Sequence, residues 1–220
     1  MTNDYPVSKQ NKVRQLREYA SYDRNSVHSI LDSAPFASVG FVQDDKPVVV
    51  PMIYGREDET IFLHGARKAR VIRLLEQTRQ VCINVTHIDG IVFARSAFNS
   101  SMNYRSATVH GTAKLVEGRD EKVHAMRVIS EHIMPGRWDE LREPLENEIK
   151  MTGVIAVEIE SASAKMTSGL PDDEDEDYAI PIWAGTLPLQ SMLTTLQDDE
   201  RLIEGVEPSA AVQALQGKIL

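Results

Sequence analysis

Cysteine is nearly absent from the sequence, since Cys82 is the only one in 220 residues. A disulfide within the chain is therefore impossible, and a structural zinc site built from several cysteines is excluded. Long apolar runs are missing too, because no stretch approaches the ~18 residues that a membrane-spanning helix needs. The first 22 residues carry four cations with no apolar stretch behind them, which is not the pattern of a signal peptide. These absences predict a cytoplasmic protein without a membrane partner.

Basic residues are in the minority. The chain has 24 Lys and Arg against 33 Asp and Glu, which gives a formal net charge of -9. Nucleic acid is not expected as the main partner, because binding phosphates along a strand needs a surplus of cations. Six of the carboxylates form one run, Asp172 to Asp177. That run lacks the spacing of a calcium-binding loop, so we expect a solvated loop there.

The common catalytic signatures are missing as well. The sequence has no Gly-x-Ser-x-Gly, no Walker-type phosphate loop and no Gly-x-Gly-x-x-Gly. Its histidines are scattered without the spacing of metal ligands, so no metal site is predicted. Cys82 lies in the apolar run Val81–Ile83, and we expect it in the core rather than as a nucleophile.

The pattern that is present is rich in strands. Alternating or β-branched segments bounded by polar turns predict strands at 36–42, 47–54, 60–64, 80–86, 91–97, 103–117 and 154–160. Asp89 and Gly90 are typical of a tight turn between the fourth and fifth of these. Helical spacing predicts helices at 9–20, 24–33, 67–76 and 120–133, the second capped by Asp23, and a weak helix near the C-terminus.

Six or seven mostly antiparallel strands with helices between particular pairs indicate an α+β protein, mainly β, built on a closed or partly closed barrel. We expect an N-terminal arm or helix at 1–20, the barrel domain at 21–165 and a C-terminal extension at 166–220.

The segment from Leu63 to Arg70 is the most informative. It joins the end of a strand to a glycine, Gly65, and then to a helix start that carries Arg67, Lys68 and Arg70. The free N–H groups and the dipole at the start of a helix attract an anion, whereas cations there oppose the dipole. A bound phosphate would explain these cations; the alternative is a solvated basic turn.

Three further segments are candidates for the same site. Tyr104, Arg105 and Ser106 begin a long strand and could reach the phosphate, or could lie on the surface. Pro51 to Tyr54 form a strand interrupted by proline, which could leave backbone groups free for a planar ring or be an ordinary edge strand. Trp183 lies in Pro181–Gly185 and either packs on its own domain or covers a ligand site.

The order of these segments resembles the pyridoxamine 5′-phosphate oxidase-like superfamily, and within it the flavin-nucleotide-binding branch that includes nitroimidazole-resistance proteins. Besides Leu63 to Ala69 and Tyr104 to Ser106, the matching segments are His110–Ala113, Met134–Arg137, Ser163–Lys165, Gly169–Pro171 and Pro181–Gly185. The resemblance implies a six-stranded antiparallel split β-barrel and a homodimer with FMN bound at the subunit interface.

The resemblance also implies roles for individual residues. The turn from His64 to Lys68 would hold the FMN phosphate through Gly65, Arg67 and Lys68, with Ala66 in place of a serine whose hydroxyl is lost. Met52, Ile53 and their neighbours Pro51 and Tyr54 would lie along the isoalloxazine ring, and Tyr104, Arg105 and Ser106 would assist at the phosphate. Trp183 would wall the pocket. His64 is the candidate catalytic residue; the alternative is a residue that only packs on the flavin.

These roles predict an FMN-dependent oxidoreductase acting on a small planar substrate. A flavin carrier or sensor without turnover and a haem-handling split-barrel protein with a histidine ligand are the alternatives, and a deazaflavin could replace FMN. The arginine- and histidine-rich C-terminal signature of the vitamin B6 oxidase is absent, so oxidation of vitamin B6 is not expected.

Overall fold

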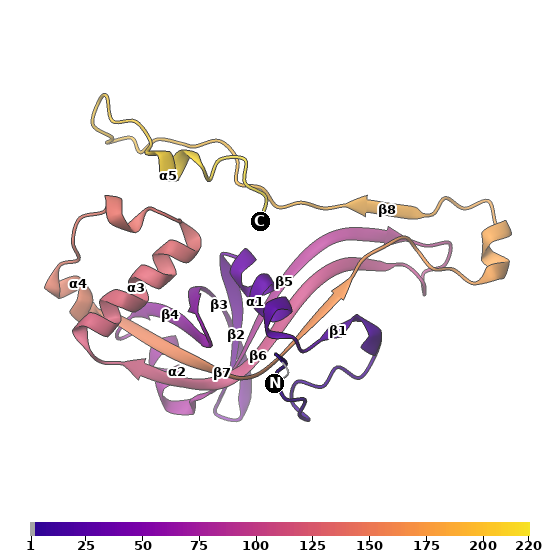
Figure 1. Ribbon diagram of the computed structural model, residues 1–220, viewed down its shortest axis with the longest axis horizontal. Coiled ribbons are helices and arrows are strands. Elements are labelled where there is room, and N and C mark those ends of the chain that lie inside the picture. The colour runs from indigo at the N-terminus through magenta and orange to yellow at the C-terminus, as the bar shows by residue number, and fades with distance from the viewer. Residues whose placement is uncertain (1–2) are drawn as a thin grey trace. The chain divides into compact units, whose positions relative to one another are not determined.

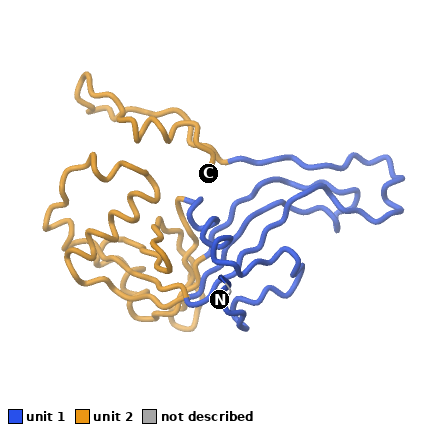
Figure 2. Tube along the Cα trace, viewed as in Figure 1, with its two compact units in different colours: residues 1–34, 84–110, 160–190 blue, residues 35–83, 111–159, 191–220 orange. Residues whose placement is uncertain are grey.

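The computed structural model describes residues 3 to 220, which divide into two compact units (Figure 2). Among the described residues, the first unit contains residues 3–34, 84–110 and 160–190, and the second contains residues 35–83, 111–159 and 191–220. Three long strands, β5 (Gln80–Phe93), β6 (Ser101–Val116) and β7 (Thr152–Thr167), contribute residues to both units.

The second unit contains a barrel. Its other strands are β2 (Phe36–Gln43), β3 (Lys46–Glu57) and β4 (Thr60–Ala66), and the order of hydrogen-bonded strands is β7-β4-β3-β2-β5-β6 (Figure 1). An additional pairing between β7 and β6 closes this order into a ring of six strands. Within this ring, the pairs β2–β3, β3–β4 and β4–β7 are antiparallel.

Alternation of side chains explains why these segments form a barrel. Along β6, Ala107, Val109, Gly111 and Ala113 are buried and the residues between them are more exposed. Gly111 permits the closure, because a Cβ there would stand 2.1 Å from the carbonyl oxygen of Glu158 on β7.

Cys82 was expected in the core, and this expectation is wrong. Along β5 the buried side chains are Val81, Ile83 and Val85, so Cys82 faces the other side of the sheet and is half-buried. Its partial burial raises the pKa of the thiol.

The helices of the second unit are α2 (Arg70–Thr78), α3 (Arg119–Ile133), α4 (Glu146–Met151) and the short α5 (Ala210–Gln213), with a 3₁₀ turn η2 (Trp138–Glu140) between α3 and α4 (Figure 1). Helix α3 packs directly on β3 at Gly55. A Cβ at Gly55 would lie 2.6 Å from the Val128 carbonyl oxygen and 2.7 Å from the Ile129 backbone, so only glycine lets the helix approach this closely.

The first unit begins with an N-terminal segment, a 3₁₀ turn η1 (Arg17–Tyr19), a short strand β1 (Ala20–Ser21) that pairs with β7, and helix α1 (Arg24–Ser33). The predicted cap is confirmed, because the Asp23 carboxylate accepts the Ser26 N–H at 2.9 Å. The predicted helix at 9–20 is wrong. Asn11 is buried and its side-chain amide donates to the carbonyl oxygens of Pro6 and Ala162, which fixes an irregular path.

The predicted turn at Asp89 and Gly90 is also wrong, because β5 runs unbroken from Gln80 to Phe93. Gly90 instead allows β8 (Gly185–Pro188) to pair closely with β5, since a Cβ there would lie 3.0 Å from the Leu187 carbonyl oxygen. Residues 91–93 of the strand predicted at 91–97 are therefore the end of β5, and residues 94–97 lie outside any strand.

The acidic run is not a simple solvated loop. Part of it forms a 3₁₀ helix, η3 (Asp175–Ala179), and the side chain of Asp173 is fully buried. The Asp173 carboxylate pairs with the Arg95 guanidinium at 2.9 Å and also accepts the Arg95 backbone N–H at 2.8 Å. The run is thereby attached to the end of β5. Within residues 3–220, no helix has the length and apolarity required to cross a membrane.

Candidate functional site

The predicted cationic segment forms the corner between β4 and α2 in the second unit. Arg67 and Lys68 occupy a turn after the end of β4, Ala69 is the N-cap, and α2 begins at Arg70 rather than at the predicted Arg67. The reason is that the Arg67 N–H donates to the Met151 carbonyl oxygen at 2.8 Å, so Arg67 is tied to the last residue of α4.

The start of α2 has no internal cap. Ala69 offers no side-chain acceptor and the first turn carries no acidic residue. The first N–H groups of any α-helix lack partners within the helix and carry its positive partial charge. This corner therefore presents unpaired donors to an incoming anion.

Side-chain cations surround the same donors. The Arg67 guanidinium pairs with Glu76 at 3.3 Å, with both side chains more than a third exposed. Lys68 is exposed and forms no ion pair with any residue from 3 to 220. Arg70 donates through Nε to the side-chain oxygen of Gln43 at 3.1 Å, which orients it without neutralising it. The corner keeps a net positive charge.

Two glycines let this corner sit close to the sheet. Gly65 on β4 lies directly opposite Gly153 on β7. A Cβ at Gly153 would stand 2.7 Å from Cγ2 of Ile72 and 3.2 Å from Cα of Arg67. Any larger residue at Gly153 would push the turn and the first turn of α2 outward. Ala66, the next residue along, ends β4 and is exposed.

His64 lies on β4, immediately before this corner, and is half-buried. Burial lowers the pKa of its imidazole, so the neutral form dominates at pH 7. Across residues 3 to 220 the structure shows no hydrogen bond or ion pair to this ring. Each of the other five histidines has such an interaction or a ring contact (His28, His87, His110, His124 and His132). His64 is thus chemically available.

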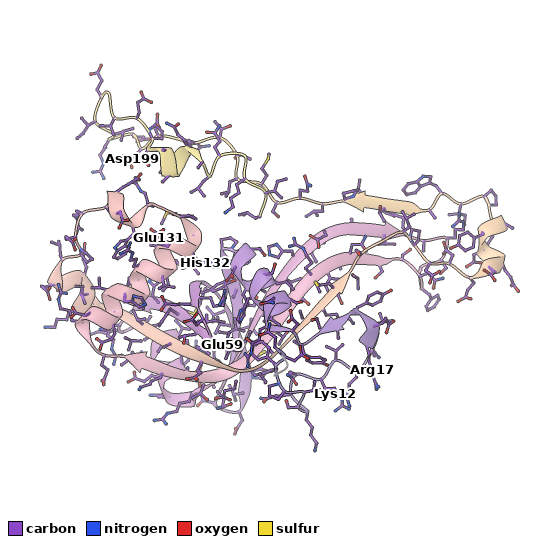
Figure 3. All side chains as sticks on the ribbon, viewed as in Figure 1. Lys12, Arg17, Glu59, Glu131, His132 and Asp199 are labelled. Atoms are coloured by element: carbon purple, nitrogen blue, oxygen red, sulfur yellow. The ribbon has the colours of Figure 1, made fainter. Side chains whose placement is uncertain are left out.

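The four residues Pro51 to Tyr54 alternate along β3. Met52 and Tyr54 are buried, whereas Pro51 and Ile53 face outward. The Tyr54 ring packs on the His132 ring of α3, with centroids 4.6 Å apart (His132 is labelled in Figure 3). Of these four side chains, only Pro51 and Ile53 are exposed to a ligand, although the strand backbone is common to all.

Tyr104, Arg105 and Ser106 lie on β6 in the first unit. The Arg105 guanidinium forms a two-pronged ion pair with Asp89 on β5, with N···O distances of 3.0 to 3.3 Å. The Ser106 hydroxyl donates to the Lys165 carbonyl oxygen at 3.4 Å. Both side chains therefore already have protein partners, and their predicted role at a phosphate stays a prediction.

An aromatic groove in the first unit adjoins Tyr104. It has a volume of about 390 Å³ and is lined by Ile91 to Phe93, Ser100 to Met102 and Tyr104. Trp183 is 70% exposed and its ring lies 5.8 Å from that of Phe93. Phe93 thus links two predicted residues, Tyr104 and Trp183.

The structure therefore gathers the predicted residues in two sets. The second unit contains the residues predicted on β3 and at the corner: Pro51 to Tyr54 and His64 to Lys68. The first unit contains Tyr104 to Ser106 and Trp183. Sequence reasoning missed Gln43, Glu76 and Gly153 at the corner. Gly153 directly precedes the strand predicted at 154–160, but nothing in the sequence signals its contact with this corner or that of Gln43.

Comparison with known proteins identifies the family. The family model described as pyridoxamine 5′-phosphate oxidase matches residues 23–166. The chain belongs to this family. No curated protein matches the sequence significantly.

Two solved structures resemble this chain over most of its length. The flavocytochrome Anf3 from Azotobacter vinelandii is 33% identical with a TM-score of 0.90, and the match covers 96% of this chain and 98% of that chain. The FAD and haem binding protein from Mycobacterium smegmatis is 33% identical with a TM-score of 0.87, covering 90% and 98%.

A third similar structure is a candidate 5-nitroimidazole antibiotic resistance protein from Bacteroides thetaiotaomicron. It is 25% identical with a TM-score of 0.57, and the match covers 66% of this chain and 85% of that chain. The predicted family and α+β split-barrel class are confirmed. The prediction was a barrel of six strands. Residues 3–220 contain eight strands, because the short strands β1 and β8 add to the ring of six.

Proposed function

We propose that this protein is a flavin-binding oxidoreductase that holds the phosphate of a flavin nucleotide at the corner of Arg67, Lys68 and the start of α2. The uncapped helix start, with four cations and one carboxylate between residues 67 and 76, is the observation that carries the proposal. A flavin phosphate fits this donor set, because it is an anion that accepts hydrogen bonds from backbone N–H groups and cations alike.

Each part of the corner has a distinct role in this proposal. Arg67 and Lys68 would neutralise the charge of the phosphate. The N–H groups of the first turn of α2 would donate hydrogen bonds that orient it. Ala66 would leave space beside the phosphate but donate no hydrogen bond. The outward side chains of β3, Pro51 and Ile53, would meet a face of the ring system. The bound flavin would supply electron transfer, and the chain would bind and orient it beside a small planar substrate.

The identity of the flavin is part of the proposal. The family resemblance favours FMN, whereas the Mycobacterium smegmatis neighbour is named for FAD and is 33% identical over 90% of this chain. That neighbour's likeness extends over nearly the whole chain, so we propose FAD ahead of FMN.

The experiment is to purify the protein without added cofactor, release the bound molecule by heat and identify it by mass spectrometry and absorption. The R67Q/K68Q variant should retain flavin at least about 100-fold more weakly, because charge-assisted hydrogen bonds contribute about 1.5–3 kcal/mol each. K114Q/K150Q, which removes two exposed cations elsewhere, is the control for net charge. Unchanged retention in R67Q/K68Q would refute the phosphate assignment.

A second cofactor, haem, is favoured by one specific observation. His64 is half-buried with a lowered pKa and has no hydrogen-bond or ion-pair partner in residues 3–220, and neutral imidazole is the form that ligates iron. Both full-length neighbours are named as flavocytochrome or as FAD and haem binding. We therefore propose that His64 would ligate the iron of a bound haem, in addition to the flavin site.

The absorption spectrum tests this second cofactor. Protein supplied with haem should show a Soret band, and H64A should lose or shift that band while it retains flavin. H124A, which changes a histidine already bonded to Glu57 at 2.7 Å, should leave the band in place. A Soret band of equal position and intensity in H64A would remove His64 from this role.

We also propose that the protein is a homodimer. The outward face of β2 and β3 carries four exposed apolar side chains: Phe36, Val42, Val49 and Ile53 are 42–66% exposed. Phe36 lies directly opposite Ile53, and Val49 lies opposite Gly40, so these side chains share one face. An exposed apolar face of this kind is typical of a protein–protein interface.

A further inference from the structure

The loop after α3 is the conspicuous segment that the flavin site does not use. It contains the Met134–Arg137 motif and η2, and together with α4 it forms a helix–loop–helix in the second unit (Figure 1). Glu131 fixes this loop, because its carboxylate accepts the Gly136 N–H at 2.7 Å and the Trp138 N–H at 3.0 Å (Glu131 is labelled in Figure 3). The loop is thereby held over one face of α3.

A cavity of about 460 Å³ lies between α3, this loop and α4. Its volume is in the range of small-molecule sites in proteins. Most of its lining is apolar, contributed by Val123, Met126, Trp138, Leu141, Pro144 and Ile149. Trp138 offers a flat ring to one side of a bound molecule, and Met126 is an adaptable side chain that accommodates different shapes. None of these residues belongs to the flavin corner.

The charged groups around the cavity are unequally satisfied. Asp139 pairs with Arg127 at 3.2 Å, and Glu148 pairs with Arg142, whose hydrogen bond lowers the pKa of Glu148 to about 2. Glu143 stands exposed at the rim.

Lys122 differs from these groups. It is half-buried, its ammonium donates only to the Thr152 carbonyl oxygen at 3.1 Å, and it forms no ion pair with any residue from 3 to 220. An ammonium carries three donors, so two remain for a ligand. The cavity thus combines apolar walls with one cation that lacks an ion pair, Lys122, and one carboxylate that lacks one, Glu143 at the rim.

We propose that this cavity binds a flat aromatic monocarboxylate, with the ring between Trp138 and Met126 and the carboxylate on Lys122. The carboxylate completes the ion pair that Lys122 lacks, and the apolar walls favour an uncharged ring. The site is independent of the flavin site and remains if the flavin assignment fails.

Isothermal titration of the purified protein, with whatever cofactor it carries, tests this proposal with 2-naphthoate as the probe. Wild-type protein should bind 2-naphthoate in the micromolar to low millimolar range and bind the neutral 2-naphthamide at least about tenfold more weakly. K122M keeps the aliphatic stem and removes the charge. It should weaken 2-naphthoate at least about tenfold and leave 2-naphthamide unchanged.

Two more variants make the result specific. K150M removes an exposed cation of α4 that does not line the cavity, and it should bind 2-naphthoate like wild type. E143Q removes the one unpaired carboxylate of the rim and should tighten 2-naphthoate slightly. No binding of 2-naphthoate to wild type at millimolar concentration, or equal affinities in K122M and wild type, would overturn the proposal.

Discussion

His64 is half-buried, and its imidazole has no hydrogen-bond or ion-pair partner in residues 3–220. Its position on β4, one residue before Gly65, follows from the strand pattern, and its half-buried state lowers the pKa of the imidazole. The unfolded chain takes up a proton on this histidine near pH 6.5, whereas the folded chain takes it up only at lower pH. The free energy of unfolding therefore falls as the pH drops from about 6.5 through the lowered native pKa.

This sign gives a prediction at the scale of one residue. In urea unfolding followed at several pH values, the free energy of unfolding of wild type should fall between pH 7 and pH 5, and that of H64Q should fall less. The slope of this free energy against pH measures the protons taken up on unfolding, and it should differ between the two proteins by up to one proton. Part of the slope should remain, because burial also lowers the pKa values of His87 and His110. Identical slopes in wild type and H64Q would show that His64 keeps its ordinary pKa.

Residues differ in how far the sequence alone predicts them. The Asp23 cap is predictable because donor and acceptor lie three residues apart. The pairs Arg105–Asp89 and Arg95–Asp173 are not, because 16 and 78 residues separate their members and only the fold brings them together. The acidic run was misread for this reason, since nothing local distinguishes the buried Asp173 from its exposed neighbours.

At the scale of elements, alternation and helical spacing predict β2, β3, β4 and β6 and the helices α1 and α3 within a few residues, whereas β5 and β7 extend well beyond their predicted ends. The errors occur where tertiary contacts override local signals. Gly90 suggested a turn but serves the close approach of β8, and the 9–20 segment is held out of a helix by the buried Asn11. The closure of β6 on β7 is likewise a long-range event that no local pattern encodes.

The β2–β3 face gives the prediction at this scale. V49K places a charge in the middle of the exposed apolar face, where a second copy would bury it, and burial of an unpaired charge opposes association. Light scattering after gel filtration should give twice the 24.6 kDa chain mass for wild type and a single chain mass for V49K. V7K, a charge at a comparably exposed valine in the N-terminal segment, is the control and should remain dimeric. A wild-type monomer, or a V49K dimer of undiminished stability, would contradict this interface.

At the scale of the whole molecule, three observations support the proposal that a flavin phosphate binds at the corner of Arg67, Lys68 and the start of α2. These are the barrel, the uncapped corner itself and the similarity to two full-length neighbours. The order of strand, glycine, cations and helix start pointed to the family, and the family model over residues 23–166 confirms it. The identity of the ring ligand was not predictable, since a planar cofactor is recognised by backbone and apolar surfaces that many sequences provide. The corner of Arg67, Lys68 and the start of α2 limits the choice of ligand most, because its cations and N–H groups require an anion.

A binding cycle therefore tests the central claim most directly. Affinities of riboflavin, which has no phosphate, and of FMN and FAD are measured for wild type and for R67Q/K68Q. The account predicts that wild type prefers the phosphorylated flavins by about 100-fold or more and that R67Q/K68Q binds all three with nearly equal, weak affinity. An undiminished preference for FMN and FAD in R67Q/K68Q would contradict the account, because the phosphate would then be held elsewhere.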